Sequence, residues 1–189
     1  MRNGIARKIL GSLILLAVMT AGGAYADEPT KPAVAHKPAT AGASADWAGL
    51  LGAADDGWTP ALIRDLAGGM TPAEAGKVLP GAEKASKYGI AKVKVKDKKG
   101  VQAIELSYLE DRENNNARVL RFAQIVIAPS VNRDKEEYQK LVDALIHKYG
   151  PVKQPEDIEK KQITWMNKNF KSAQLYEIGG QLTLKIALE

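Results

Sequence analysis

The chain has 189 residues, with 27 Lys and Arg against 22 Asp and Glu, and it contains no cysteine. The lack of cysteine excludes disulfides and a lipid-modified N-terminus, so stability must come from an ordinary hydrophobic core. Without the three cations Arg2, Arg7 and Lys8, 24 basic residues remain against 22 acidic ones, a net charge of +2. Such a small excess gives no sign of nucleic-acid binding.

Residues 1–26 are typical of a secretory signal peptide. A positive start is followed by the apolar run "ILGSLILLAVM" and then by "AYA", which places small residues at the cleavage site. The alternative, an uncleaved membrane anchor, would need a longer apolar run. The sequence therefore predicts cleavage after Ala26, a periplasmic or secreted location, and no lipoprotein processing.

Residues 27–56 are rich in Ala, Pro, Gly, Ser and Thr, and they predict a flexible linker. Within them, "DWAGLLG" offers Trp47, Leu50 and Leu51, either as a disordered sticky patch or as a docking segment. A single domain is expected over 57–189, a length sufficient for one core.

Two short helices are predicted at the start of this domain. In "TPALIRDLAGG", Thr59 is the expected N-cap of a helix of about two turns. In "GGMTPAEAGKVLPG", Thr71 is the expected N-cap and Glu74 completes a capping box. Val78 and Leu79 are expected to face the core before Pro-Gly ends the helix.

Three strands are predicted next, at 91–97, 101–109 and 118–128. The first alternates valines with lysines, and the second alternates apolar with polar residues. In the third, we place Leu120, Phe122 and Val126 together on the buried side.

The second half begins with the clearest helix, "RDKEEYQKLVDALIHKYG". Its apolar residues recur at helical spacing, acidic residues lie in its first turn, and Gly150 ends it. Strands are then predicted at 162–167, 172–178 and 181–189, with the last two joined by Gly179-Gly180. The buried face of the last strand is expected to consist of Leu182, Leu184, Ile186 and Leu188.

This order predicts an α+β fold built from antiparallel meander sheets with helices packed on one face. The chain divides into two similar α-βββ halves, at about 57–128 and 132–189.

Gly69-Met70-Thr71 followed by Glu74 resembles the "GMT-x-x-E-V" segment of the SmpA/OmlA outer-membrane assembly lipoproteins. Ala75 stands where that family has Val, and the family's lipidated Cys is missing. The doubled helix-plus-meander layout is similar to the β-lactamase-inhibitor-protein type of fold. The resemblance implies that the protein works by binding other proteins rather than by catalysis.

Motifs for catalysis or cofactor binding are not found. The two histidines are His36 and His147, and there is no H-E-x-x-H, G-x-S-x-G, P-loop or Rossmann pattern. The acidic clusters at 110–113, 134–137 and 156–159 fall in loops or first helical turns, where a solvated surface is the ordinary explanation. We therefore expect no enzyme, no cofactor and no metal, with an unrecognised carboxylate site as the remaining enzymatic alternative.

The candidate binding residues are mostly basic. The run "KVKVKDKK" places three lysines on one side of a strand, and further cations are expected to join them on the same sheet face. A tryptophan is added because interface hot spots favour this residue. An ordinary solvated sheet face is the alternative interpretation. The possible partner-binding residues are Lys92, Lys94, Lys96, Arg121, Trp165 and Lys185.

The sequence thus predicts an exported, non-enzymatic protein-binding module of the cell envelope, whose partner is another protein or an acidic envelope component. The alternative is a proteinaceous inhibitor of a periplasmic or secreted enzyme. Neither nucleic acid nor an integral membrane segment in the mature chain is expected.

Overall fold

The structure is a computed structural model that describes residues 44–113 and 115–188. The predicted signal peptide and the first part of the predicted linker, 27–43, lie outside the described residues. Within the described part of the chain, no helix has both the length and the apolar character needed to cross a membrane.

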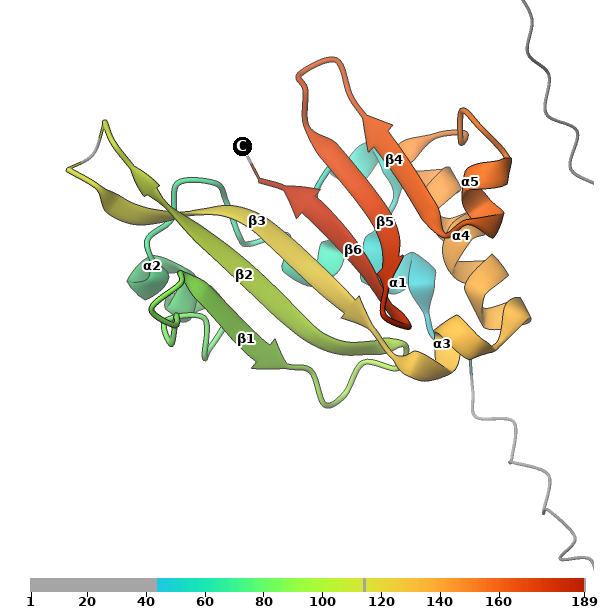
Figure 1. Cartoon of the computed structure of the whole chain (residues 1–189), viewed down its shortest axis with the longest axis horizontal. Helices are drawn as coiled ribbons and strands as arrows, with labels where there is room; N and C mark the ends of the chain where they lie inside the picture. The colour runs from blue at the N-terminus through green and yellow to red at the C-terminus, as the bar shows by residue number, and fades with distance from the viewer. Residues whose placement is uncertain (1–43, 114, 189) are drawn as a thin grey trace, which may run out of the picture. The chain divides into compact units, whose positions relative to one another are not determined.

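The six strands and the two longer helices follow each other in the predicted order, and the described chain has three short helices besides, α1, α3 and α5 (Figure 1). The helices are α1 (Trp47–Leu51), α2 (Pro72–Val78), α3 (Pro129–Arg133), α4 (Lys135–Tyr149) and α5 (Glu156–Glu159). The strands are β1 (Ile90–Lys94), β2 (Val101–Asp111), β3 (Ala117–Ile127), β4 (Gln162–Met166), β5 (Ser172–Ile178) and β6 (Gln181–Ala187).

All six strands belong to one antiparallel sheet in the order β1-β2-β3-β6-β5-β4. Each half of the chain contributes one meander, and the two meanders join where β3 pairs with β6. The helices lie on one side of this sheet (Figure 1). The predicted α+β class, with helices on one face and two similar α-βββ halves, is therefore confirmed.

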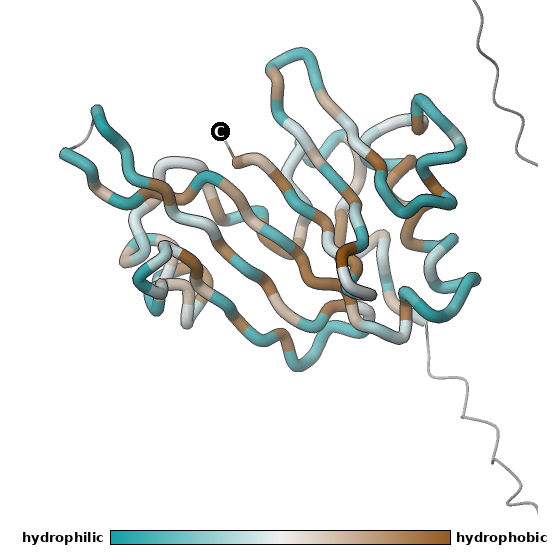
Figure 2. Tube along the Cα trace, viewed as in Figure 1, coloured by the Kyte–Doolittle hydropathy of each residue, from teal (hydrophilic) through white to brown (hydrophobic). Residues whose placement is uncertain are grey.

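The core lies between the sheet and the helices. Apolar and polar residues alternate along several strands (Figure 2), and one set points toward the helices. Leu182, Leu184 and Ile186 of β6 are fully buried, as are Leu141 and Leu145 of α4. The apolar stripe predicted for the long helix is thus the surface that α4 packs against the sheet.

Helix α2 begins as the sequence predicts. The backbone N–H of Glu74 donates to Thr71 Oγ1 at 3.4 Å, and the Thr71 N–H donates to Glu74 Oε2 at 2.8 Å. This capping box satisfies two backbone donors that the first turn leaves without helical partners. Leu79 packs against the core as expected, but Val78 is 44% exposed, so its predicted inward orientation is wrong. Helix α2 ends at Val78, and only the next residue, Leu79, points to the core.

Thr71→Ala is expected to lower the free energy of unfolding by roughly 1 kcal/mol, because the Glu74 N–H loses its acceptor. Urea denaturation followed by circular dichroism measures this change. Thr71→Ser keeps the hydroxyl and should unfold close to the wild type. An alanine variant that unfolds at the wild-type urea concentration would show that the cap contributes nothing.

The segment before α2 differs from its prediction. Thr59 caps no two-turn helix, since only a single 3₁₀ turn forms, at Ala61–Ile63. The chain then runs along the sheet: the N–H of Gly69 donates to the Leu120 carbonyl at 2.9 Å, and the Leu120 N–H donates to the Met70 carbonyl at 2.7 Å. These bonds to β3 compete with helix formation, and they fix α2 against the sheet.

Residues 44–56 belong to the folded domain, which corrects the predicted linker over 27–56. Trp47 and Leu51 of α1 are 4% and 2% exposed, so burial of large side chains offsets the entropy of ordering this Ala-rich segment. Gly100 makes room for the indole, because a Cβ at this position would lie 2.7 Å from two Trp47 ring atoms. Of the two interpretations of "DWAGLLG", the docking segment is therefore correct.

Lys148 ties this segment to α4. Its ammonium donates to the carbonyls of Ala53 at 3.2 Å and Gly57 at 3.0 Å, and the residue is 6% exposed. Burial lowers the pKa of Lys148, partly opposed by the nearby Asp56 carboxylate.

Strand β3 contains a β-bulge at Arg121. Beyond the bulge, the side chains that were predicted to be buried point to the opposite face of the sheet. Leu120 pairs with Tyr108 and Phe122 pairs with Ser107, so Arg121 is the extra residue. Leu120 therefore points to the core, whereas Phe122 and Val126, predicted beside it, point to the opposite face. The core positions beyond the bulge are instead those of Ala123, Ile125 and Ile127.

Two buried tyrosines make stability sensitive to alkaline pH. Tyr108 donates to the Ala82 carbonyl at 3.0 Å and Tyr138 to the Ile158 carbonyl at 2.7 Å. Burial raises the pKa of each to about 12, from an ordinary value of 10.0. Between these values the unfolded chain loses the phenolic protons and the folded chain keeps them. Stability should therefore fall as pH rises from about 10 to about 12.

Urea midpoints measured across this pH range should decline, and Tyr108→Phe should make the decline shallower because it removes one of the tyrosines whose pKa is raised. A midpoint that stays constant up to pH 12 would contradict burial of the two phenols.

Candidate interaction surface on the open face of the sheet

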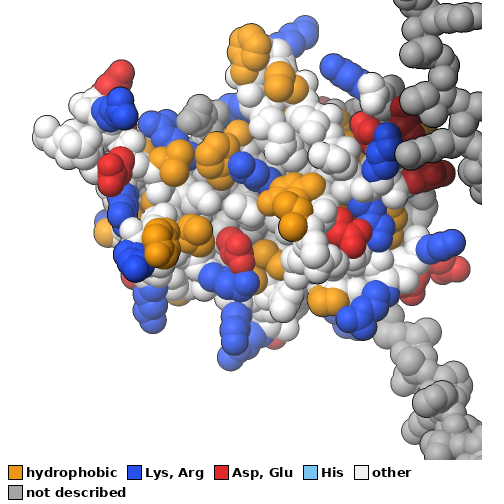
Figure 3. Space-filling model, in the orientation of Figure 1, with side chains coloured by type: hydrophobic (Ala, Val, Ile, Leu, Met, Phe, Trp, Pro, Cys, Tyr) orange, Lys and Arg blue, Asp and Glu red, His pale blue; other side chains and the backbone are white. Residues whose placement is uncertain are grey.

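One face of the sheet carries no helix within the described part of the chain, and we call it the open face. It faces the viewer in Figure 1 and, in space-filling form, in Figure 3. Strand alternation and register assign its side chains. They are Ile90, Lys92, Lys94, Ala103, Glu105, Ser107, Leu109, Asp111, Ala117, Val119, Phe122, Gln124, Val126, Gln162, Thr164, Met166, Ser172, Gln174, Tyr176, Ile178, Gln181, Thr183, Lys185 and Ala187.

A polar row crosses the middle of the open face from one sheet edge to the other. Cross-strand pairing aligns one polar residue from every strand. Within this row, Lys92 Nζ lies 2.6 Å from Glu105 Oε1. In spatial order the row is Lys92, Glu105, Gln124, Lys185, Gln174 and Thr164.

Two aromatic side chains flank the middle of this polar row. Lys185 Nζ lies 4.1 Å from the centroid of the Phe122 ring, a cation–π geometry. On the other side, the Tyr176 hydroxyl donates to Gln124 Oε1 at 3.0 Å. Burial raises the pKa of Tyr176, with a smaller contribution from Glu105, so its hydroxyl remains a donor at neutral pH. These contacts hold the four central side chains in defined positions.

Exposed apolar side chains lie around this centre, toward the edges and ends of the sheet. Four of the large hydrophobic residues exposed in the described chain lie on the open face: Ile90 at 46%, Leu109 at 50%, Met166 at 61% and Ile178 at 72%. Figure 3 shows hydrophobic side chains spread over the strands with Lys and Arg between and around them. The open face therefore combines an ordered aromatic centre with exposed apolar side chains around it.

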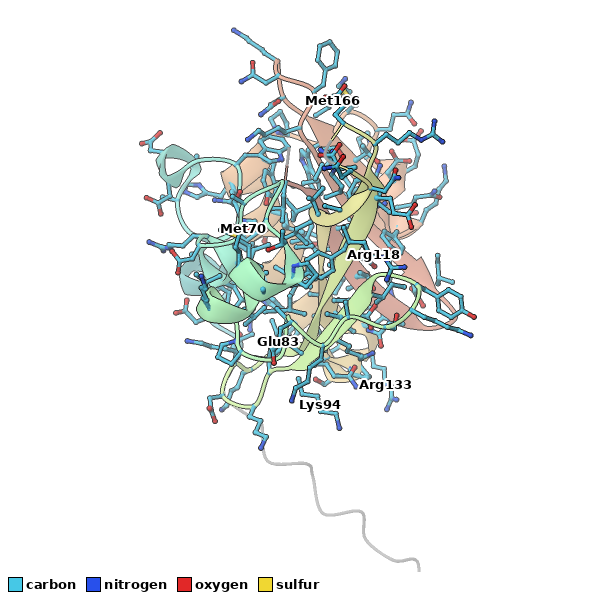
Figure 4. All side chains as sticks on the ribbon, turned by 90° about the vertical axis from the view of Figure 1, so that its left-hand side faces the viewer. Met70, Glu83, Lys94, Arg118, Arg133 and Met166 are labelled. Atoms are coloured by element: carbon cyan, nitrogen blue, oxygen red, sulfur yellow. The ribbon has the colours of Figure 1, made fainter. Side chains whose placement is uncertain are left out.

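The open face also carries an excess of positive charge. Lys92, Lys94 and Lys185 lie on it, against Glu105 and Asp111, and Asp111 Oδ2 lies 3.7 Å from Arg121 Nη2. Figure 4 shows α2 and Met70 on the helical side of the sheet, and labels Lys94 and Met166 toward opposite ends of the molecule. The surface is therefore extended, positively charged and partly apolar.

The structure brings three of the six predicted residues onto this face: Lys92, Lys94 and Lys185. Lys96 is exposed but follows the end of β1, in the turn toward β2. Arg121 lies at the bulge, with its Nη2 3.7 Å from Asp111 Oδ2.

Trp165 is wrongly predicted as a partner-binding residue. It is 4% exposed, and its Nε1 donates to the Gly150 carbonyl at 2.9 Å. In β4 the residues that face the core are Ile163 and Trp165, so the indole packs among the helices. Its neighbour Met166 occupies the exposed position instead.

Phe122, Tyr176, Met166 and Gln124 lie on the open face but are not among the predicted site residues. Alternation in "SAQLYEI" separates Tyr176 from the buried Leu175, and this signal was available. No comparable signal existed for Phe122, because the bulge that turns it outward depends on pairing with β2.

Other hollows of the described chain offer little chemistry. One of them, of about 410 Å³, lies beside α1 and includes Asp46 and Asp97. Asp46 Oδ1 already accepts the Gly49 N–H at 2.9 Å as the cap of α1. In the described residues no three His, Cys, Asp or Glu side chains converge as a metal site.

Comparison with known proteins gives no family for this chain. No protein-family model, no curated protein and no solved structure matches it.

Proposed function

We propose that the chain is a non-enzymatic protein-binding module of the cell envelope, which binds its partner through the open face of the sheet. The observation that carries this proposal is that exposed Ile90, Leu109, Met166 and Ile178 surround a half-buried aromatic centre on the face that no described helix covers. The second face of such a sheet has only to be compatible with water, and a wholly polar surface would be sufficient for that. Apolar side chains placed around ordered aromatic residues favour a docking surface.

The composition of the open face fits the anatomy of protein interfaces. Phe122 and Tyr176 are half-buried, held by neighbours, and central, which is where binding energy concentrates. Lysines of the face favour a partner with an acidic surface, since complementary charge speeds encounter and fixes orientation.

The envelope location follows from the predicted signal peptide. The resemblance of residues 69–81 to the SmpA/OmlA segment supports the same location and a role in binding proteins. The structure gives this segment a scaffold role, because Thr71 and Glu74 cap a helix on the side of the sheet opposite the proposed surface.

Reversing charge on the open face tests the proposal. The full chain is used to capture partners from an envelope extract, and the affinity of each recovered protein is then measured for variants. Lys94→Glu combined with Lys185→Glu is expected to weaken binding by about tenfold or more, which corresponds to ~1.4 kcal/mol. Lys135→Glu makes a similar change in the first turn of α4, on the helical side, and should leave affinity unchanged.

Two other results of this experiment would replace the proposal. Recovery of one hydrolase that loses activity on binding would identify the protein as an inhibitor. Equal binding by the double variant and the wild type would show that the open face is not the docking surface.

A further inference from the structure

The two edges of the sheet, β1 and β4, are protected to different degrees. An edge strand exposes backbone N–H and C=O groups that can pair with another strand. At β1, the Ser86 N–H donates to the Ile90 carbonyl at 2.8 Å, and the Ile90 N–H donates to Ser86 Oγ at 3.3 Å. Lys92 and Lys94 place charge along the rest of that edge. The β1 edge is therefore blocked against strand addition.

The β4 edge has neither kind of protection. Beyond its two ends, the Glu177 N–H donates to the Lys161 carbonyl at 3.1 Å and the Asn167 N–H to the Lys171 carbonyl at 3.0 Å. Antiparallel bonding alternates, so Ile163 and Trp165 direct their backbone groups toward β5. The alternate residues Gln162, Thr164 and Met166 then direct their N–H and C=O groups outward. No group in the described part of the chain hydrogen-bonds to these outward groups.

The side chains of β4 also permit strand addition. The sequence of β4 is QITWM, which contains no charged residue and no proline, and its pairing with β5 shows no register shift. All three outward-bonding residues are exposed. Natural edges commonly carry one of these protective features, and β4 has none of them.

We propose that β4 pairs antiparallel with β4 of a second copy of this chain, about a twofold axis at Thr164. In this register Thr164 faces its own copy, and Gln162 faces Met166 in both directions. Each of these three pairs exchanges two hydrogen bonds, so all outward groups of both strands are satisfied. Antiparallel pairing of a strand with itself is a twofold operation, the commonest symmetry of soluble oligomers.

Charge at the two ends of β4 supports this occupant. The short helix α5 precedes β4 and carries Glu156, Asp157 and Glu159, which outnumber the following Lys160, whereas the hairpin after β4 carries Lys168 and Lys171. Lys161, between α5 and β4, is engaged within the chain, 3.3 Å from Glu177 Oε2. Figure 1 shows α5 beside the start of β4 and the hairpin at the other end. Antiparallel pairing therefore brings the acidic end of each copy toward the basic end of the other.

Such a dimer goes beyond the proposed function and does not depend on it. The twofold axis is perpendicular to the joined sheet, so both open faces lie on the same side. The assembly presents two copies of the surface side by side, and a partner with two matching sites would gain from this arrangement.

Sedimentation equilibrium of the full chain from micromolar to millimolar concentration tests the proposal. The wild type is expected to dimerise. Thr164→Lys places two like charges opposite each other across the axis, and should raise the dimer dissociation constant at least about tenfold. Gln174→Lys adds the same charge in the same polar row, one strand inward, and should dimerise like the wild type.

Two further variants probe the backbone and the register. Thr164→Pro removes an outward N–H, leaves the β5 ladder intact, and should also be monomeric. The chain has no cysteine, so Thr164→Cys gives a single reporter that should cross-link to its copy under oxidation, while Lys92→Cys on the β1 edge should not. A wild type that stays monomeric to millimolar concentration, or dimers that survive both Thr164→Lys and Thr164→Pro, would overturn the proposal.

If an extended segment of another protein binds this edge instead, the wild type stays monomeric. The Thr164 N–H then gains protection from hydrogen exchange only in the presence of that protein. This result also overturns self-pairing. The Lys94 and Lys185 test above does not involve β4, so the two proposals fail independently.

Discussion

Trp165→Ala is expected to lower the free energy of unfolding by about 3–5 kcal/mol, because it removes a large buried side chain and leaves a cavity. The indole lies between the sheet and the helices, 5.7 Å from the Tyr149 ring between centroids. The substitution also leaves the Gly150 carbonyl without the donor it has at 2.9 Å. Urea denaturation of the variant measures the loss.

The neighbouring residue provides the matched control. Met166 is 61% exposed on the open face, and Met166→Ala should change stability by less than about 0.5 kcal/mol. The reverse pattern, a stable Trp165→Ala variant that loses partner binding, would mean that the indole belongs to the interaction surface.

Trp47→Ala is expected to cost a similar amount, about 3–5 kcal/mol, although Trp47 lies in a segment whose composition predicts a linker. Its 4% exposure and its contact with Gly100 make it part of the core. Thermal and urea unfolding of the full-length variant provide the measurement.

Truncated chains test whether residues 44–56 are part of the folded domain or of a linker. A chain beginning at residue 44 should unfold close to the full chain, whereas one beginning at residue 57 loses α1 and the Ala53 carbonyl that binds Lys148. The shorter chain should be strongly destabilised. If it unfolds like the longer one, residues 44–56 contribute nothing to the fold.

Local sequence rules account for much of the fold. The capping box at Thr71 depends on residues three apart, and the stripe of α4 on residues one turn apart, so both could be predicted. Alternation in the six strands likewise gave the α+β class and the correct inward face of β6.

The errors occurred where distant contacts decide the structure. Trp47 becomes ordered because it packs beside Gly100, and composition within 27–56 carries no information about that contact. The bulge at Arg121 exists only through pairing with β2, so strict alternation placed Phe122 on the wrong face.

The candidate surface could be predicted only in part, because some of its residues also depend on contacts between distant segments. Lys92 and Lys94 could be placed because β1 alternates without interruption, and Lys185 because β6 does. The aromatic centre could not, since Phe122 depends on the bulge. The prediction of Trp165 relied on residue type alone. Alternation along β4 places Trp165 on the buried side of the strand, together with Ile163.

Site-specific photo-cross-linking tests the central claim, that the open face is the docking surface, most directly. A photoreactive phenylalanine derivative replaces Gln124, at the centre of the open face, or Gln139, on an exposed position of α4. Irradiation in an envelope extract is expected to link a distinct protein to the chain carrying the probe at position 124 and not to the chain with the probe at position 139. Cross-links that form from position 139 and are missing from position 124 would contradict the claim.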